Sequence, residues 1–483
     1  MMETFPTAGL WMLLALALLI TTTGLPVWAL LIGTATAFAA FGWLVGLIDL
    51  TVLSAISGRT LGLLENDLLQ ALPLYVFVGI LLQRLTLADT LFSVLARLFH
   101  WTGAGTSLAA FGVGALVAPM NGSVASSSAM MARLVAPRLA QMNTAAATAL
   151  ISVSSTIGVV VPPSLVLILL GDAMLRAHTE ASNLPGYVLG SQRIINTQDV
   201  FHAALMPAGV VLLLWMLVAW WQGRQSVCGP PKPRLSGAQW LVSVGVIVVT
   251  LLLLSAVFLG KLFAVEAAAT GGVLLIMVTL ASRGLGRTQW RAVLSDTLNL
   301  SGALLALLVG ATTFSLIFRL FGTDRWMTSL VMNSHLAPLL TAALVLLLVA
   351  LCAWVLDAFE MIFVIIPILA PLLIALLGDA QQVAVLLLLV LQLSFLMPPL
   401  GYAVMMARSH SGLSRSSVWD TLRALRPYIA VQSTVTLWVF FMPSVLHTFD
   451  APLQVQAPIS AEDLDRQMRE MAEKGDQLEG AAR

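Results

Sequence analysis

Long apolar runs alternate with short polar segments along most of the chain. The first three runs cover residues 8–24, 25–47 and 68–86, close to the roughly 20 residues that an α-helix needs to cross a bilayer. They lack the strict alternation of apolar and polar positions that is typical of barrel strands. The pattern therefore predicts an all-α polytopic membrane protein. Amphipathic stretches at 49–66 and 89–100 are typical of interfacial arms.

Two later segments of the first half are apolar but interrupted. Residues 103–140 are split near Gly122, and each half is too short to cross the bilayer comfortably, so we predict a re-entrant hairpin. Residues 144–171 form an interrupted span, because Pro162 and Pro163 remove backbone donors from the helix. The first half then ends with a polar loop and one more span, at 172–199 and 200–222.

The second half repeats this order of elements. Its predicted segments are spans at 238–258, 264–282, 295–318 and 424–446, a hairpin at 336–377 and an interrupted span at 382–410. A shift of 236 positions places Gly122 on Ala358, and the pair Pro162 and Pro163 on Pro398 and Pro399. Each half then has five crossings and one hairpin. Because five is odd, the halves face opposite ways, which predicts the inverted repeat of many secondary transporters.

These repeats divide the chain into four parts. We assign residues 1–223 to the first inverted repeat, 224–236 to a cytoplasmic linker, 237–449 to the second inverted repeat and 450–483 to a polar tail. With the linker in the cytoplasm, fourteen Lys and Arg residues lie inside, six lie outside and four lie in the tail. The inside set includes Arg84, Arg133, Arg138 and Arg423, and the outside set includes Arg319. That bias agrees with the positive-inside rule. Both chain ends are therefore predicted to be periplasmic.

Composition excludes several other classes of protein. The chain is 59% hydrophobic and 10% charged, whereas soluble domains carry about 25% charged residues. The net charge of +1 comes without a basic stripe, so nucleic acid is not an expected partner. Cys228 and Cys352 lack metal-ligand spacing, and no HExxH, GxSxG, CxxC or P-loop pattern occurs. We therefore expect neither an enzyme nor a resident cofactor.

The interruptions are the candidate binding positions. Backbone that breaks its helix at membrane depth is tolerated only where it is buried or lines a cavity. Unwound carbonyls and hydroxyl or amide oxygens suit Na⁺, and half-helix N-termini suit a carboxylate. The first predicted cation site contains Asn121, Gly122, Ser123, Ser126, Ser154, Ser155, Thr156 and Gly158. The second contains Leu356, Asp357, Ala358, Gln392, Leu393 and Ser394. Residues expected near the substrate are Ser123, Thr156, Pro162, Pro163, Glu360, Pro398 and Pro399.

Structural roles compete with these functional ones. A Ser or Thr in a membrane helix often bonds back to a carbonyl of its own helix or helps helices to pack. Asp357 has two interpretations as well, because an acid at this position either caps the second half-helix or binds a cation. Packing of small residues alone does not explain why both halves break at matched positions.

These motifs resemble the large membrane subunit of the tripartite ATP-independent periplasmic (TRAP) transporters. The similar segments are SSTIGVVVPPSLVLILLGD at 154–172, LDAFEMIFVIIPILAP at 356–371 and LQLSFLMPPLGYAVM at 391–405. PPSLVLILLGD and LDAFE are most similar to the mannitol/chloroaromatic-type subgroup. The resemblance covers most of residues 8–446. The chain has Val390 and Leu393 where relatives often carry Asn and Thr, so fewer oxygen ligands remain.

The resemblance implies a Na⁺-driven elevator in the bacterial inner membrane that imports a carboxylate. A periplasmic substrate-binding protein would deliver this solute, and a small four-helix membrane subunit, expected here as a separate chain, would brace the scaffold. Three alternatives stay open: a stand-alone symporter, a proton-coupled symporter that uses Asp357 or Glu360, and a non-transporting membrane anchor that keeps the fold.

Overall fold

The computed structural model describes most of the two predicted repeats. It covers residues 7–49, 54–65, 67–85, 87–121, 123–139, 142–161, 164–182, 195–224, 236–281, 284–333, 336–397, 401–413 and 416–449. Over these residues the regular structure is entirely helical. Five helices are long and apolar enough to cross a membrane, or up to eight if each bent pair of helices is one span. The described part of the chain therefore has the helical architecture of a polytopic membrane protein.

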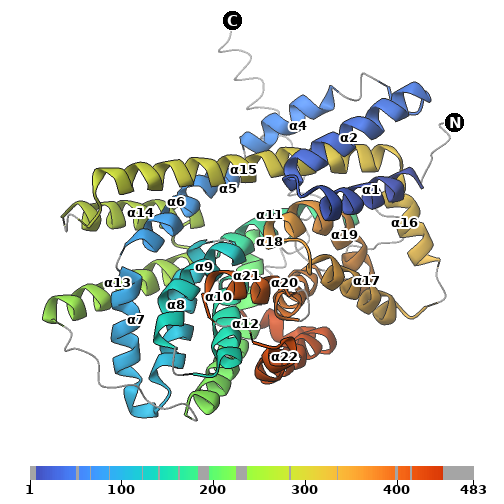
Figure 1. Ribbon diagram of the computed structural model, residues 1–483. Coiled ribbons are helices and arrows are strands. Elements are labelled where there is room, and N and C mark those ends of the chain that lie inside the picture. The colour runs from blue at the N-terminus through green and yellow to red at the C-terminus, as the bar shows by residue number, and fades with distance from the viewer. Residues whose placement is uncertain are drawn as a thin grey trace, which may run out of the picture. The chain divides into compact units, whose positions relative to one another are not determined.

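One group of helices, which we call the frame, is built around the long helix α15 (Figure 1). α15 packs along α2 and α6, α14 packs on α6, and α13 packs on α14. The frame comprises α1 (Ala8–Thr23), α2 (Val27–Leu44), α4 (Ala55–Leu64), α5 (Asp67–Gln70), α6 (Leu72–Arg84), α13 (Gly237–Phe258), α14 (Ala264–Ala281), α15 (Arg287–Leu320) and α16 (Thr323–Met332). These helices include most of the predicted uninterrupted spans.

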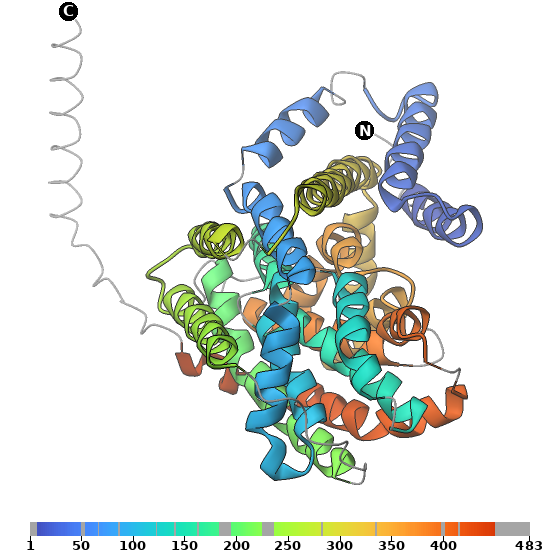
Figure 2. The same ribbon diagram turned by 60° about the vertical axis from the view of Figure 1, so that its left-hand side comes forward.

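The second group, which we call the core, contains both interrupted segments. From the first half it takes α8 (Gly105–Asn121), α9 (Val124–Val135), η2 (Ala136–Arg138), α10 (Thr144–Val160), α11 (Leu165–Ala181) and α12 (Thr197–Gly223). From the second half it takes α17 (Pro338–Cys352), α18 (Ala358–Glu360), the π-helical turn η3 (Met361–Ile365), α19 (Ile366–Leu377), α20 (Ala380–Leu396), α21 (Tyr402–His410), α22 (Val418–Phe441) and η4 (Pro443–Phe449). In Figure 2, where α15 is strongly foreshortened, it lies above the helices of the core.

An arm formed by α7 (Leu87–Leu98) and η1 (His100–Thr102) connects the two groups. α7 packs along α8 of the core and also touches α13 of the frame. It bends by 68° from α6, and its apolar side faces inward through buried residues such as Leu91 and Phe92. This segment overlaps the amphipathic stretch that the sequence predicts at 89–100.

Helices α10 and α20 lie at the centre of the core. Nearly every side chain of both helices is buried, as expected of a helix that is apolar on all sides. Their N-termini are capped by Asn143 and Asp379, whose side chains accept backbone N–H groups of the first turn. Both helices have 17 residues and their bounds are related by the shift of 236, Thr144 with Ala380 and Val160 with Leu396.

The two breaks also agree in backbone conformation. Val161, which follows α10, and Met397, which follows α20, are both extended, with ψ of 115° and 109°. These residues are again 236 positions apart. The pairs Pro162–Pro163 and Pro398–Pro399, which we expected to cause the breaks, lie outside the described residues. Helices α10 and α20 therefore end just before the positions at which the sequence predicts interruptions.

Two boundaries differ from the expectation. Helix α11 continues past residue 171, the predicted end of the interrupted span, to Ala181. An ion pair between Asp172 and Arg176, one turn apart at 2.9 Å, supports the additional turns. In the second hairpin, the arm Ala358–Leu377 has 20 residues and is long enough to cross a membrane. Length alone therefore does not distinguish this arm from a span.

Candidate functional site

The tips of the two hairpins are in direct contact. Ser123 precedes α9 in an extended conformation, but its side chain makes no capping bond to α9. The Ser123 Oγ instead donates to the Asp357 Oδ2 at 2.9 Å, across 234 positions of sequence. One residue from each half thus closes the contact between the tips.

Asp357 stands at the start of two half-helices. Its own backbone N–H donates to the Glu360 Oε2 at 3.1 Å, which completes a capping box at the start of α18. The Asp357 carboxylate also faces the backbone N–H groups of Val124 and Ala358, the first residues of α9 and α18. Both N-termini carry partial positive charge, which stabilises an acid between them. The Asp357 Oδ1 is buried and has no hydrogen-bond partner among the described residues.

A buried chain of amides joins the two interrupted spans. The Gln392 Nε2 on α20 donates to the backbone carbonyl of Thr156 on α10 at 3.1 Å. These two residues are 236 positions apart, so they are equivalent under the predicted repeat. The Gln432 Nε2 on α22 in turn donates to the Gln392 Oε1 at 2.9 Å. All three residues are buried, and the amides tie α10, α20 and α22 together just before the two breaks.

The hydroxyl groups of α10 point mostly into their own helix. Ser154 donates to the Leu150 carbonyl at 2.7 Å, and Thr156 donates to the Val153 carbonyl at 2.9 Å. Ser155 donates to the Ser152 carbonyl and accepts from the Ser128 hydroxyl on α9 at 2.9 Å. These hydroxyl groups therefore form the hydrogen bonds to carbonyls of their own helix that the sequence suggested as the alternative to binding a ligand.

The other predicted ligands have different surroundings. Ser126 accepts a hydrogen bond from the Gln83 Nε2 of α6 at 2.7 Å, so it faces the frame and not α10. Ser394 donates to the Ala350 carbonyl of α17. Gly158, Leu356 and Ala358 are buried, and Leu393 and Glu360 are half-buried. Asn121 ends α8, and Gly122 lies outside the described residues together with the four break prolines, Pro162, Pro163, Pro398 and Pro399.

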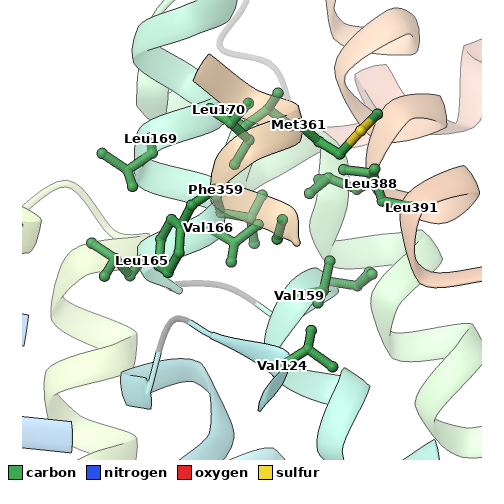
Figure 3. Packing of buried hydrophobic residues seen from close by; sticks show 14 of the residues in the cluster. Val124, Val159, Leu165, Val166, Leu169, Leu170, Phe359, Met361, Leu388 and Leu391 are labelled. Carbon is green, nitrogen blue, oxygen red and sulfur yellow. The ribbon is translucent and has the colours of Figure 1, made fainter. Parts of the chain in front are cut away.

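Apolar side chains from both halves surround the meeting point of the tips. In Figure 3, Phe359 from the second tip lies beside Leu165 and Val166 of α11, and Val124 of the first tip lies near Val159. The other labelled side chains, Leu169, Leu170, Met361, Leu388 and Leu391, come from α11, η3 and α20. This apolar packing keeps water away from the polar groups, which strengthens any electrostatic interaction there.

Gln432, Ser128 and Gln83 were missed among the candidate residues. Gln432 is the buried amide of the last span, and a lone Gln in an apolar run was the available signal. Ser128 belongs to the hydroxyl cluster after Gly122, and Gln83 ends an apolar run beside Arg84. Their partners lie on other helices, so sequence spacing could not identify them.

The chain is similar to several known transporters. Residues 13–445 match the family described as "Tripartite ATP-independent periplasmic transporter, DctM component". The chain is 20% identical over 406 residues to the C4-dicarboxylate TRAP transporter large permease protein DctM of Rhodobacter capsulatus, which covers 82% of this chain and 89% of that protein. It also resembles the crystal structure of the YdaH transporter of Alcanivorax borkumensis, with a TM-score of 0.54 at 12% identity over 90% of this chain and 99% of that one. At this identity the structural likeness concerns the fold alone.

Proposed function

This chain belongs to the DctM component family of tripartite ATP-independent periplasmic (TRAP) transporters, and we propose that it imports a carboxylate-bearing solute by coupling to Na⁺. Membership in this family makes it a large permease component of a TRAP transporter and a multi-pass membrane protein. The family is one of transporters and not of enzymes. The coupling ion, the solute and the movement are the parts that we propose.

One observation carries the proposal: equivalent elements of both halves meet at one place. The Ser123–Asp357 contact joins the hairpin tips, and the Gln392–Thr156 contact joins the interrupted spans. The ends of broken helices leave backbone groups without partners in their own helix. Their convergence brings N–H groups, carbonyls and one carboxylate oxygen of Asp357, which has no hydrogen-bond partner among the described residues, into one region. This is the set of groups that a cation and an anionic solute need together.

Oxygen donors support Na⁺ as the coupling ion. The candidate groups at the tips and breaks are carboxylate, hydroxyl, amide and carbonyl oxygens, and hard cations prefer oxygen ligands. The two predicted cation sites would then be coupled, because Ser123 and Thr156 of the first contact Asp357 and Gln392 of the second.

A carboxylate is the solute that fits the half-helix N-termini. Asp357 already faces the N-termini of α9 and α18, whereas α11 and α21 begin after the two breaks, and helix N-termini attract negative charge. The R. capsulatus relative is named for C4-dicarboxylates. The assignment to the mannitol/chloroaromatic-type subgroup rests only on the PPSLVLILLGD and LDAFE motifs.

The inverted repeat and an elevator movement of the core against the frame complete the proposal. Matched bounds of α10 and α20 and matched conformations at Val161 and Met397 support the repeat. Three ion pairs between distant segments support the proposed topology. Arg84–Asp296 and Arg138–Asp89 each join charges predicted to be inside, and Arg319–Glu180 joins charges predicted to be outside. We place the protein in the bacterial inner membrane with periplasmic termini.

Two partners belong to the proposal. A periplasmic substrate-binding protein would deliver the solute, and a small four-helix membrane subunit would brace the frame. Exposed apolar side chains on α1 and α2, including Trp11, Leu14 and Phe41, suit contact with lipid or with such a subunit.

Uptake into proteoliposomes tests this function directly. The chain is reconstituted with the small membrane subunit and the periplasmic binding protein, and a labelled dicarboxylate is added. We expect uptake that requires an inward Na⁺ gradient and the binding protein. A second candidate, proton coupling, is favoured by the two acids Asp357 and Glu360 in one capping box. Uptake driven by a pH gradient and indifferent to Na⁺ would support that candidate.

The same assay separates the remaining alternatives. Uptake without the binding protein and the small subunit would indicate a stand-alone symporter. Absence of uptake under both gradients, with the three components assembled, would indicate a non-transporting membrane anchor and would contradict the proposed function.

A further inference from the structure

A cavity of about 610 Å³ lies between α6, α9 and α15, where the first hairpin meets the frame. This volume is in the range of small-molecule sites. Five of its eight lining residues are polar, and the full set is Ile80, Gln83, Arg84, Arg133, Asp296, Asn299, Leu300 and Ala303. The proposed function does not use these residues.

Gln83 links this cavity to the candidate site. Its Nε2 donates to Ser126 at 2.7 Å, and its backbone carbonyl accepts from the Arg133 guanidinium. Ser126 and Arg133 are seven residues apart on α9, so they lie on the same side of that helix. Ser126 is one turn from Ser123, which contacts Asp357. A continuous line of polar groups therefore runs from the hairpin tips along α9 into the cavity.

The charge of the cavity favours an anion. Arg84 is paired with Asp296, and its charge is neutralised within the lining. Arg133 donates to a neutral carbonyl, and no ion pair is formed by it in the part of the chain that the structure describes. The lining therefore has one excess positive charge, on a guanidinium whose planar group of donors matches a carboxylate. Asn299 and Gln83 add neutral amides beside it.

We propose that this cavity is a second binding position for the carboxylate solute, and that Arg133 is the residue that holds it there. The inference rests on the proposed function, because it takes its ligand class from that function. Arg84 and Arg133 belong to the charges predicted to face the cytoplasm, so the cavity lies on the release side of the tips. The solute would pass from the tips along α9 and pause at Arg133 before it leaves.

A free solute fits this lining better than a lipid does. A phospholipid would place its acyl chains along a long apolar wall, whereas the apolar lining here consists of Ile80, Leu300 and Ala303. The polar groups also come from both the frame and the hairpin, which suits a ligand that is held between them. Lipid binding is nevertheless a distinct outcome of the following experiment.

Protection of an introduced cysteine tests the proposal. Ala303 lines the cavity and is exposed, so Ala303→Cys, in a background with Cys228→Ser and Cys352→Ser, gives a reporter that reacts with a maleimide. The full-length chain is purified with its small membrane subunit. We expect succinate to slow the labelling, and the neutral isostere succinamide to have no effect. Arg133→Gln should raise the half-maximal succinate concentration at least tenfold, and Arg133→Lys should raise it less.

The matched control is Arg423→Gln, which removes an Arg that is exposed, predicted to lie on the same membrane side and paired with Asp420. This variant should leave the succinate concentration for half-maximal protection of the cysteine unchanged. Equal protection in the parent and in Arg133→Gln, with Arg133→Lys also unchanged, would overturn the proposal. Protection by vesicles of anionic phospholipid but not by succinate would also overturn it, in favour of a lipid site.

Uptake measured on the same preparations keeps the two proposals apart. Succinate protection that depends on Arg133, without any uptake, would support the cavity and contradict the proposed transport. Normal uptake without succinate protection would contradict the cavity alone.

Discussion

Asp357 is the residue at which the hairpin tips of the two halves make a polar contact. It accepts from Ser123 of the other half, shares a capping box with Glu360 and keeps one buried carboxylate oxygen without a partner among the described residues. A cap needs only one acceptor, which Asn supplies as well as Asp. A residue that also binds a cation needs, in addition to this acceptor, a second oxygen that is available to the cation and a negative charge. Substitution can therefore separate the two roles.

We predict that Asp357→Asn will leave the free energy of unfolding nearly unchanged and will weaken the dependence of uptake on Na⁺. Asn and Asp are similar N-caps, so the unfolding free energy should change by less than about 0.5 kcal/mol. The Na⁺ concentration for half-maximal uptake should rise at least tenfold. Thermal unfolding in detergent and Na⁺-dependent uptake measure the two effects.

Asp357→Ala is the matched comparison, because it removes both the cap and the charge. It should lower the unfolding free energy by about 0.5–2 kcal/mol, in addition to the effect on Na⁺. An unchanged Na⁺ dependence in Asp357→Asn would mean that Asp357 serves as a cap only.

At the scale of single elements, the break after α20 depends on a close approach of the backbone. Gly401 precedes α21, and a Cβ at this position would lie 2.9 Å from the Phe395 carbonyl oxygen and 3.0 Å from the Met397 carbonyl oxygen. These oxygens belong to the last turn of α20 and to the extended residue after it. Backbone atoms cannot move aside as a flexible side chain can, so the break requires glycine here.

Gly401→Ala should therefore destabilise the protein by about 1–3 kcal/mol, the usual cost of overpacking. The same change should reduce uptake, because the ends of α20 and α21 shift apart at the candidate site. Gly209→Ala in α12 is the control, since a Cβ there meets nothing within 4 Å. It should be neutral or stabilise the helix by about 0.5–1 kcal/mol. Equal unfolding midpoints for both variants would contradict the steric argument.

At the scale of the whole molecule, the frame and the core meet through a few polar contacts. Glu180 at the end of α11 pairs with Arg319 of α15 at 2.5 Å, and Gln83 of α6 donates to Ser126 of α9 at 2.7 Å. The short amphipathic helices of the two halves, α7 and α16, pack differently. α7 packs along α8 of the core, whereas α16, its counterpart in the proposed repeat, packs against α1 and α15 of the frame. In an elevator movement, the contacts of the core with the frame would differ in this way between the outward-facing and the inward-facing state.

A cross-link between core and frame tests this movement. Glu180→Cys with Arg319→Cys, in a background without native cysteines, can be joined by a short bifunctional thiol reagent. We expect the cross-link to reduce uptake to background, because the core can no longer move along the frame. Uptake before and after the reagent is the measurement.

The control pair is Asp379→Cys with His447→Cys, whose native side chains meet at 2.9 Å within the core. Cross-linking this pair should leave uptake within about twofold of its starting value, since both residues move together. Full uptake with the Glu180–Arg319 positions joined would contradict the elevator.

Local properties of the chain were sufficient to predict its membrane class and the positions of its breaks. Apolar run length predicts helices, and prolines and clustered small residues predict where helices end, because both act within a few residues of sequence. The shift of 236 was visible for the same reason, and α10 and α20 agree with it at both ends. The end of α11 was not visible, because Asp172 and Glu180 look like loop residues until their ion pairs are known.

Partners across the molecule were decided only by the tertiary structure. From the sequence we expected Ser123 to face α10 and Ser126 to share its site, but Ser123 meets Asp357 and Ser126 meets Gln83. Gln432 joins Gln392 and Thr156 from a span that carried no candidate, and the cavity at Arg133 needs three helices at once. A hydrogen bond depends on which helices pack together and on their rotation. Hydropathy and proline spacing, which determined the elements, contain no information on either.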